Sequence, residues 1–299
     1  MEKKDEKAEA SKPIVYMTTD ISSAGLMAVY AALNRKLEGK VAVKISTGEP
    51  GGKNFLQPSL IRELVQSVKG TIVECNTAYG GSREDSDMHL QVARDHGFTA
   101  IADVDIMDRE GEISLPFANG KNITEDFVGS HFRNYDSFLV LSHFKGHAAG
   151  GFGGAIKNIS IGIASSGGKV WIHSAGNSKQ FPIIDWELPQ DPFLESMAEA
   201  AGAVMTALGD NMLYISVMNR LSVDCDCNAE PAEPDMHDIG ILASIDPVAL
   251  DKACVDLVYA APDGHSLIER MESCNGIHTL NHAAALGLGS LKYKLVNLD

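Results

Sequence analysis

Short apolar runs alternate with stretches of helical periodicity along the first third of the chain. The runs have strand length, and in each intervening stretch apolar side chains recur every three or four residues. The predicted strands are residues 14–18, 41–45 and 71–75, and the predicted helices are residues 26–37, 58–68 and 85–96. This rhythm predicts an α/β fold with a mostly parallel, helix-covered, Rossmann-like sheet, to which a second, smaller lobe could be attached.

The rest of the chain continues the pattern with less regularity. Residues 137–142 read as a buried strand, and residues 213–223 alternate like a long strand that ends just before Cys225 and Cys227. The other predicted elements are a hairpin within 113–123, helices at 191–208, 246–259, 264–274 and 280–286, strands at 239–243 and 291–298, and a loop at 228–238. We expect residues 1–12 to be a disordered charged tail and residues 13–299 to form one domain, with at most a soft boundary between two lobes.

The composition is that of an ordinary globular protein, with 44% apolar and 22% charged residues among 299. A net charge of −15 argues against a nucleic-acid-binding surface, and no apolar run approaches the roughly 20 residues of a membrane span. The N-terminal tail lacks the apolar segment of a secretory signal. The five cysteines are odd in number and form no C-x-x-C ladder, which argues against a disulfide scaffold and for a reducing, cytoplasmic location.

The stretch richest in reactive side chains is the loop that follows the strand at 137–142. It carries His143, Lys145, His147 and Lys157 together with five glycines. Imidazoles can ligate a metal or move a proton, lysines supply positive charge, and glycines let the backbone approach a ligand. Because ligands of α/β sheets lie at strand ends, this loop is predicted to carry the functional site. The alternative is a flexible crossover whose histidines are merely solvated.

Two further sites are predicted beside this loop. The loop lacks the phosphate-loop and dinucleotide-binding patterns, but a backbone nest near Ala155 could still hold an anion. Cys225 and Cys227 would share one face of the predicted strand and could bind a soft metal, with histidines as further donors. Two packed, unreactive thiols are the alternative for this pair.

Loops after the other predicted strands carry further candidates for ligand contact. Lys44 lies at the carboxyl end of its strand, where it meets either an anionic ligand or solvent. His89 and His96 are expected on a helix surface. The predicted catalytic residues are His143, His147 and Lys157; the predicted ligand-binding residues are Lys44, Asn76, Tyr79, Lys145, Gly151, Gly153, Gly154, Asn158 and His173; and the predicted metal ligands are Cys225, Cys227, His143 and His147.

Several ordered motifs resemble a known family, the uncharacterised iron–sulfur centre proteins that carry domain of unknown function number 362. The strongest match runs over residues 143–158, and others cover residues 43–50, 76–79, 96–98, 225–227, 238–242, 246–249, 276–280 and 286–290. Many members carry a ferredoxin-like insert with cysteine-bound clusters after the segment that matches His173. Residues 174–192 of this chain hold no cysteine, so a ferredoxin-type iron–sulfur cluster is not expected.

The glycine stretch is also similar to a motif of the lactate racemase family, in which a histidine precedes a glycine-rich run and a lysine. This similarity implies a two-domain α/β architecture, a nickel-pincer nucleotide and histidines that transfer protons.

Together these patterns favour an enzyme that binds a metal (zinc, iron or nickel) or a metal-containing cofactor and acts on a small anionic molecule. A racemase-like reaction and an oxidoreduction both fit, and Lys44, Lys145 or Lys157 would hold the substrate's carboxylate or phosphate. Neither nucleic acid nor membrane is expected as a partner, and the oligomeric state stays open. The alternatives are a non-catalytic redox or metal-binding protein derived from an iron–sulfur architecture, and a nucleotide- or phosphate-binding module.

Overall fold

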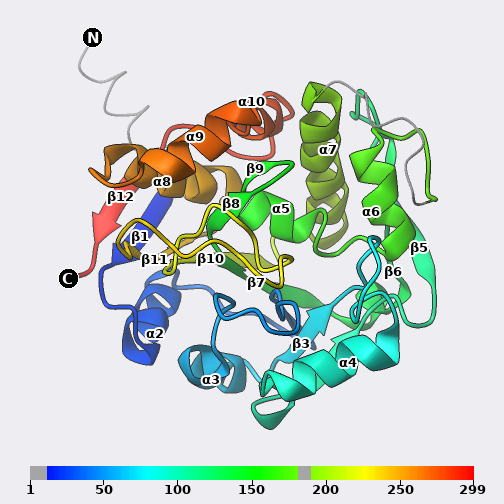
Figure 1. The fold of residues 1–299 in the computed structure, drawn as a ribbon, viewed down its shortest axis with the longest axis horizontal. Helices are drawn as coiled ribbons and strands as arrows, with labels where there is room; N and C mark the ends of the chain where they lie inside the picture. Colours follow the sequence, from blue (N-terminus) through cyan, green and yellow to red (C-terminus); the bar gives the residue numbers. More distant parts are fainter. Residues whose placement is uncertain (1–11, 181–189) are drawn as a thin grey trace.

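A central sheet of eight strands, covered by helices on both faces, organises the computed structural model, which describes residues 12–180 and 190–299 (Figure 1). The predicted disordered tail covers residues 1–12, and residues 1–11 of it lie outside the described residues. The strand order is β12-β1-β11-β10-β7-β2-β3-β4, and β11 is the antiparallel member, while the other neighbours run parallel. The strands are β1 (Ile14–Thr18), β2 (Val41–Lys44), β3 (Thr71–Glu74), β4 (Val104–Ile106), β7 (Ser137–His143), β10 (Met212–Met218), β11 (Gly240–Ser244) and β12 (Lys294–Asn297). The predicted α/β fold with a mostly parallel sheet is confirmed.

The helices form two layers around this sheet. Figure 1 shows α2, α3 and α4 on one side and α5, α7, α8, α9 and α10 on the other. Their bounds are α2 (Ser23–Ala32), α3 (Pro58–Ser67), α4 (Ser86–Asp95), α5 (Ala155–Ile159), α6 (Ser166–His173), α7 (Gln190–Leu208), α8 (Pro247–Ala260), α9 (His265–Ser273) and α10 (Ile277–Ala285), with single 3₁₀ turns η1 (Phe98–Ala100) and η2 (Ser130–Asn134). In α3, a proline at the first turn fixes the helical φ where the backbone N–H needs no partner.

The central strands alternate their side chains between two separate apolar cores. In β7, Leu139 and Leu141 pack into the core beneath α2 and α3, whereas Phe138 and Val140 pack into the core beneath α5 and α7. All seven residues of β7 are buried. A strand buried on both faces reads as a continuous apolar run, which is why this segment is recognisable in the sequence.

Two small antiparallel ribbons lie outside the main sheet. Strands β5 (Glu112–Pro116) and β6 (Glu125–Gly129) form a hairpin that starts where the predicted one does but reaches further along the chain. Strands β8 (Lys145–His147) and β9 (Gly151–Gly153) fold the glycine loop back on itself. The glycine loop is therefore an ordered ribbon and not a flexible crossover.

The long strand predicted over residues 213–223 is wrong in its second half. Strand β10 ends at Met218, where its partners β7 and β11 also end their pairing. Arg220 then adopts a left-handed backbone conformation with φ of 45°, which turns the chain away from the sheet. Cys225 and Cys227 consequently lie in the loop beyond the strand, and the argument that strand alternation places them on one face fails.

The order of the strands creates a crevice at one edge of the sheet. From β2 the chain continues through β3 and β4 on one side and returns with β7 and β10 on the other. The connections therefore leave the carboxyl ends of β2 and β7 in opposite directions, which is where open α/β sheets bind ligands. Among residues 12–180 and 190–299, no helix combines the length and apolar character that crossing a membrane requires.

Asp126 in β6 gives the fold a measurable pH dependence. The residue is fully buried, and its Oδ2 atom has no hydrogen-bond partner among the described residues. Burial raises the pKa of Asp126 from its usual 3.8 to about 8. The folded state thus holds the Asp126 proton more tightly than the unfolded state does. The stability that this protonation contributes is complete below about pH 4 and is lost as the pH rises to 8.

We expect Asp126→Asn to remove this dependence on pH. Between about pH 5 and pH 7 the wild-type free energy of unfolding should fall, relative to that of the variant, by roughly 1 kcal/mol per pH unit. Urea unfolding at both pH values measures the difference. Asp210→Asn, at a side chain that is 93% exposed, should leave the wild-type slope unchanged, and parallel pH profiles for wild type and Asp126→Asn would contradict the assignment.

Candidate functional site

A cavity of about 260 Å³ opens at the crevice between β2 and β7. It is bordered by the loops that follow β2, β3 and β7, by α5 and α6, and by the loop between β10 and β11. The lining residues that matter below are Lys44, Glu74, Thr77, Tyr79, Arg83, His143, Lys145, His147, Gly153, Gly154, Lys157, Asn158, Lys169, His173, Cys225, Asp226 and Cys227. Segments from four distant parts of the sequence therefore meet at one cavity, as the strand-end argument predicts.

Asn158 holds the two strand ends of the crevice together. Its Nδ2 atom donates to the Lys44 and Leu141 carbonyl oxygens, each at 3.3 Å, and to the Ser142 hydroxyl at 3.1 Å. These acceptors belong to β2 and β7, so one amide group bridges the strands where their connections diverge. The predicted ligand-binding residue Asn158 thus lines the cavity and also fixes its floor.

Lys44 and Glu74 form a buried ion pair in the lining of the cavity. The Lys44 Nζ and Glu74 Oε2 atoms are 2.8 Å apart, and Lys44 also donates to its neighbour's carbonyl at Ile45. Oε1 of Glu74 accepts the Thr47 backbone N–H at 2.8 Å. Burial alone would raise the pKa of Glu74, but the surrounding basic groups, Lys44 foremost and Arg83 among them, together outweigh it and hold that pKa at about 2. Burial lowers the pKa of Lys44.

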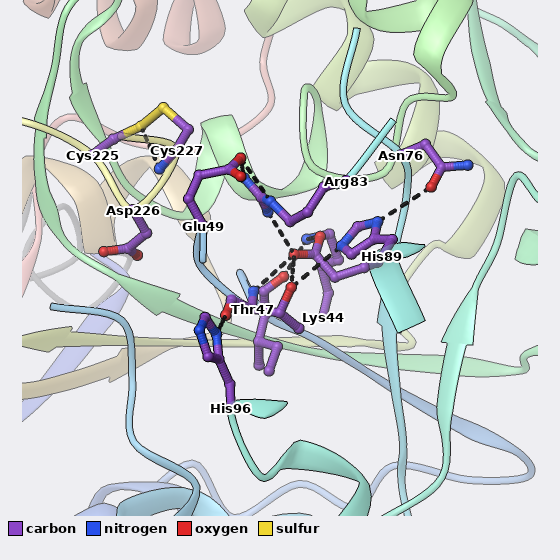
Figure 2. Close-up of polar contacts among 12 residues, drawn as sticks. Lys44, Thr47, Glu49, Asn76, Arg83, His89, His96, Cys225, Asp226 and Cys227 are labelled. Atoms are coloured by element: carbon purple, nitrogen blue, oxygen red, sulfur yellow. Dashed lines mark hydrogen bonds and ion pairs between the residues drawn. A yellow bond between two sulfur atoms is a disulfide. The ribbon is translucent and has the colours of Figure 1, made fainter. Parts of the chain in front are cut away.

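A second ion pair joins the loop after β2 to the loop after β3. Arg83 Nε donates to Glu49 Oε1 at 2.8 Å, and the Tyr79 hydroxyl donates to the same oxygen at 2.7 Å. The Glu49 backbone N–H also donates to the Asp226 carbonyl at 3.0 Å. Figure 2 shows Glu49 between Arg83 and the loop that carries Asp226. Three loops are thereby tied together around the cavity.

Asn76 lies outside the cavity lining, although it was predicted to bind the ligand. Its Oδ1 atom is 3.2 Å from His89 Nδ1, and its Nδ2 atom donates to Ser86. His89 itself is fully buried, so its predicted place on a helix surface is wrong. The other ring nitrogen of His89 lies 3.3 Å from the Thr47 hydroxyl, and burial lowers the pKa of His89 to about 3. Asn76 and His89 thus stabilise the loop that carries Thr47 and are not part of the cavity lining.

Asp226 anchors the two basic residues that open the glycine loop. Its carboxylate lies 3.0 Å from His143 Nδ1 and 2.7 Å from Lys145 Nζ. The other nitrogen of His143 faces the Asn219 carbonyl oxygen at 2.7 Å. Both nitrogens of His143 therefore face partners within the protein, and neither is left for a metal or for a substrate. This geometry argues against the predicted roles of His143 as a metal ligand and as a catalytic base.

His147 and His173 are held in opposite tautomers by the main chain. The Gly150 N–H donates to His147 Nδ1 at 2.9 Å, so a neutral His147 carries its proton on Nε2. His173 Nδ1 lies 2.7 Å from the Lys169 carbonyl oxygen, which can only accept, so its Nε2 retains a lone pair. Burial lowers the pKa of His147 well below its usual value and that of His173 to about 4. One ring is thus a proton donor to the cavity and the other a proton acceptor.

Lys157 is the lining lysine without a partner. Lys169 donates to the Ala164 carbonyl at 2.6 Å, but no acceptor for Lys157 Nζ is found among residues 12–180 and 190–299. Burial, and next the ammonium group of Lys145, lower the pKa of Lys157 to about 7. Nearby, the buried Thr77 hydroxyl also lacks a partner within the described chain. These are polar groups that a bound ligand would satisfy.

Cys225 and Cys227 are joined in a disulfide at the edge of the cavity (Figure 2). The odd cysteine count argued against a disulfide scaffold; the chain instead has one local bridge within the described residues. A ring nitrogen of His147 and the two sulfurs lie within 4.8 Å of one another. Joined sulfurs are not thiolate ligands, so these donors suit a metal ion once the bridge is reduced.

The predicted anion nest at Ala155 is already filled. The Asp251 carboxylate accepts the Ala155 N–H at 2.7 Å and the Ile156 N–H at 2.9 Å. A Cβ atom on Gly154 would lie 2.3 Å from Asp251 Oδ1, so a side chain there would exclude this contact. Gly151 is also outside the lining, because it packs against Gly276. The glycines of the loop serve close packing more than phosphate binding.

The sequence analysis missed several charged residues of the site. Glu74, Arg83, Lys169 and Asp226 were not among the predicted site residues. A signal was present for Glu74 and Asp226, since a carboxylate inside an apolar strand or between two cysteines requires a buried partner. Their partners could not be identified, because pairing at the crevice depends on the strand order.

Comparisons with known proteins identify a sequence family and distantly similar structures. The sequence model of the family described as Domain of unknown function (DUF362) matches residues 41–256. No curated protein matches the chain. The fold is similar to the lactate racemase apoprotein from Thermoanaerobacterium thermosaccharolyticum (TM-score 0.48, 14% identity, 81% of this chain and 56% of that chain) and to a protein from Thermotoga maritima (TM-score 0.45, 14% identity, 78% and 57%). The chain spans little more than half the length of either structure, and likenesses this distant carry no argument about its activity.

Removing the Asp226 carboxylate should destabilise the protein. Asp226→Ala leaves Lys145 buried without its counter-charge, and we expect a loss of about 3 kcal/mol in the free energy of unfolding, measured by urea denaturation. Glu230→Ala on the exposed part of the same loop should change it by no more than about 0.5 kcal/mol. Equal effects of the two substitutions would show that the Asp226 cluster contributes no more than any surface charge.

Proposed function

The chain belongs to the family described as Domain of unknown function (DUF362), and from that premise we propose that it is an enzyme that binds a small anionic substrate in the cavity and moves a proton on it. His147 Nε2–H is the proton donor and His173 Nε2 the proton acceptor. Lys157 and Lys169 hold the anionic group. The partner is thus a small molecule, and neither nucleic acid nor membrane takes part.

The charge of the cavity carries this proposal. Among the described lining residues, cationic side chains outnumber carboxylates, although the whole chain has a net charge of −15. The cations are Lys44, Arg83, Lys145, Lys157 and Lys169, and the carboxylates are Glu74 and Asp226. The nearby Glu49 compensates Arg83, which leaves Lys157 and Lys169 without a carboxylate partner. Uncompensated positive charge in a partly enclosed space is stabilised when an anion joins it.

The size and the backbone of the site favour a small carboxylate over a nucleotide. A cavity of about 260 Å³ is at the low end of the range for ligand pockets. The α5 N-terminus, where a phosphate would sit, is occupied by Asp251. These observations support a substrate of few heavy atoms and argue against the nucleotide-binding alternative.

Anion binding should depend on pH through Lys157. Oxalate is expected to bind saturably near pH 6 and about tenfold more weakly near pH 9, because the ammonium group, with its pKa of about 7, loses its charge in between. His147 and His173 stay neutral over this range, so they do not contribute. Isothermal titration calorimetry measures the affinities.

Lys157→Arg is the matched control for this experiment. A guanidinium group stays charged throughout, so the affinity of this variant should be nearly independent of pH. The absence of saturable oxalate binding near pH 6 would contradict the proposed function. An unchanged pH profile in Lys157→Arg would show that another group binds the anion.

The cluster of His147, Cys225 and Cys227 favours a second function, which is binding of a soft metal ion by the reduced protein. Two thiolates suit zinc, iron or nickel, and the His147 imidazole can join them as a third ligand in the other tautomer, in which it gives up the Gly150 N–H bond, with a coordination position left open toward the cavity. When bound, such an ion would act as a Lewis acid on an oxygen of the anion. Formation of the disulfide abolishes the site, so metal binding would report the redox state.

Cobalt titration tests this second function. The protein reduced with a phosphine should bind one Co²⁺ per chain with sulfur-to-cobalt charge-transfer absorption, and the oxidised protein should not. Cys225→Ser with Cys227→Ser should abolish the absorption without loss of thermal stability. Cys274→Ser, at a half-buried thiol away from the cavity, should leave it intact. Equal absorption in the double variant would mark the two cysteines as packing residues.

A further inference from the structure

We propose that the side-chain amine of Lys157 is a nucleophile that forms a Schiff base with the carbonyl carbon of a small α-keto acid held in the cavity. This inference rests on the proposed function and specifies its substrate class. It assigns Lys157 a covalent role in addition to anion binding.

The argument begins with what the other lining lysines do. Lys44 is tied to Glu74, Lys145 to Asp226, and Lys169 to the Ala164 carbonyl oxygen. Each of these amines is therefore protonated or shielded by its partner and is a poor nucleophile. Lys157 has no such partner among the described residues, and its side chain lines the cavity.

The surroundings of Lys157 also favour its neutral form. It is half-buried, and the ammonium groups of Lys145 and Lys44 act on it from neighbouring segments. Its pKa of about 7 makes a sizeable fraction of the amine neutral near pH 7, as a nucleophilic lysine requires. A purely structural role would be served better by an apolar side chain, which carries no desolvation cost.

Gly153 leaves room for the substrate between two lysine stems. A Cβ atom on Gly153 would lie 3.5 Å from Lys157 Cδ and 3.9 Å from Lys145 Cε. Both lysine side chains thus border the space that a side chain at Gly153 would enter. An α-keto acid places its carboxylate one bond from its carbonyl carbon, so Lys169 can hold the carboxylate while Lys157 faces the carbonyl.

The two tautomerically fixed histidines complete the chemistry. The Lys157 nitrogen attacks the carbonyl carbon, a C–N bond forms, and the nitrogen loses a proton to His173 Nε2. The carbonyl oxygen, which accepts a hydrogen bond from His147 Nε2–H, takes from His173 the proton that the nitrogen lost, takes a second proton from solvent, and leaves as water. The product is the protonated imine, and no oxidant or reductant takes part. Both histidines line the same cavity as Lys157, whose positive charge helps to lower the pKa of each.

Borohydride trapping tests the inference. The full chain is incubated with pyruvate near pH 7, reduced with sodium borohydride, digested and mapped by mass spectrometry. We expect an adduct on Lys157 at close to one per chain and at least tenfold above that on any other lysine. Lys157→Arg should lose the adduct, whereas Lys53→Arg, at an exposed lysine outside the cavity, should keep it.

The remaining outcomes separate this inference from the proposed function. Thermal unfolding of Lys157→Arg and of a second variant, Lys157→Met, verifies that loss of the adduct is not loss of fold. Saturable pyruvate binding by calorimetry without an adduct on Lys157, or labelling spread evenly over exposed lysines, would overturn the nucleophile and leave anion binding standing. The absence of both binding and adduct for pyruvate, together with no oxalate binding, would overturn both.

Discussion

The confinement of several like charges around one small cavity is the constraint on which the rest of this structure depends. Lysines 44, 145, 157 and 169 border a space of about 260 Å³, where each desolvated ammonium group raises the energy of the others. Glu74 and Asp226 compensate two of them and, in doing so, join segments that are far apart in sequence. The ion pairs that make the site chemically distinctive therefore also hold its loops in place.

The backbone accommodates these charges in ways that the side chains alone could not. The loop between β10 and β11 reaches the cavity because the chain turns at Arg220, and the Glu49 N–H then fixes the Asp226 carbonyl. At the other end of the glycine loop, the Asp251 carboxylate accepts the first N–H groups of α5, which it can reach because Gly154 has no side chain. Main-chain geometry thus decides which carboxylates meet cations and which cap a helix.

The sequence predicted the architecture well because periodicity is a local property. The apolar run of β7 and the proline at the start of α3 specify their elements without reference to any partner. It also predicted that Lys44, the glycine loop and the cysteine pair would share a cavity, since strand ends of a parallel sheet meet at one edge. The end of β10 at Met218 was missed, because the alternating pattern continues past the point where the neighbouring strands stop pairing.

The roles of individual side chains were beyond the sequence for a different reason. His143 and His147 are four residues apart in the same loop and look equivalent as a pattern. In the folded chain, His143 is surrounded by acceptors, whereas His147 receives a backbone N–H. That difference arises because the fold brings the Asp226 loop to His143 and the turn at Gly150 directs a backbone N–H at His147, and neither contact can be assigned from the sequence pattern. The other basic side chains of the cavity lining have partners among the described residues. Lys157 Nζ, His147 Nε2–H and His173 Nε2 are the groups left to contact a ligand. A cavity that leaves such groups unsatisfied is complementary to an anion that can accept a proton and be attacked at carbon.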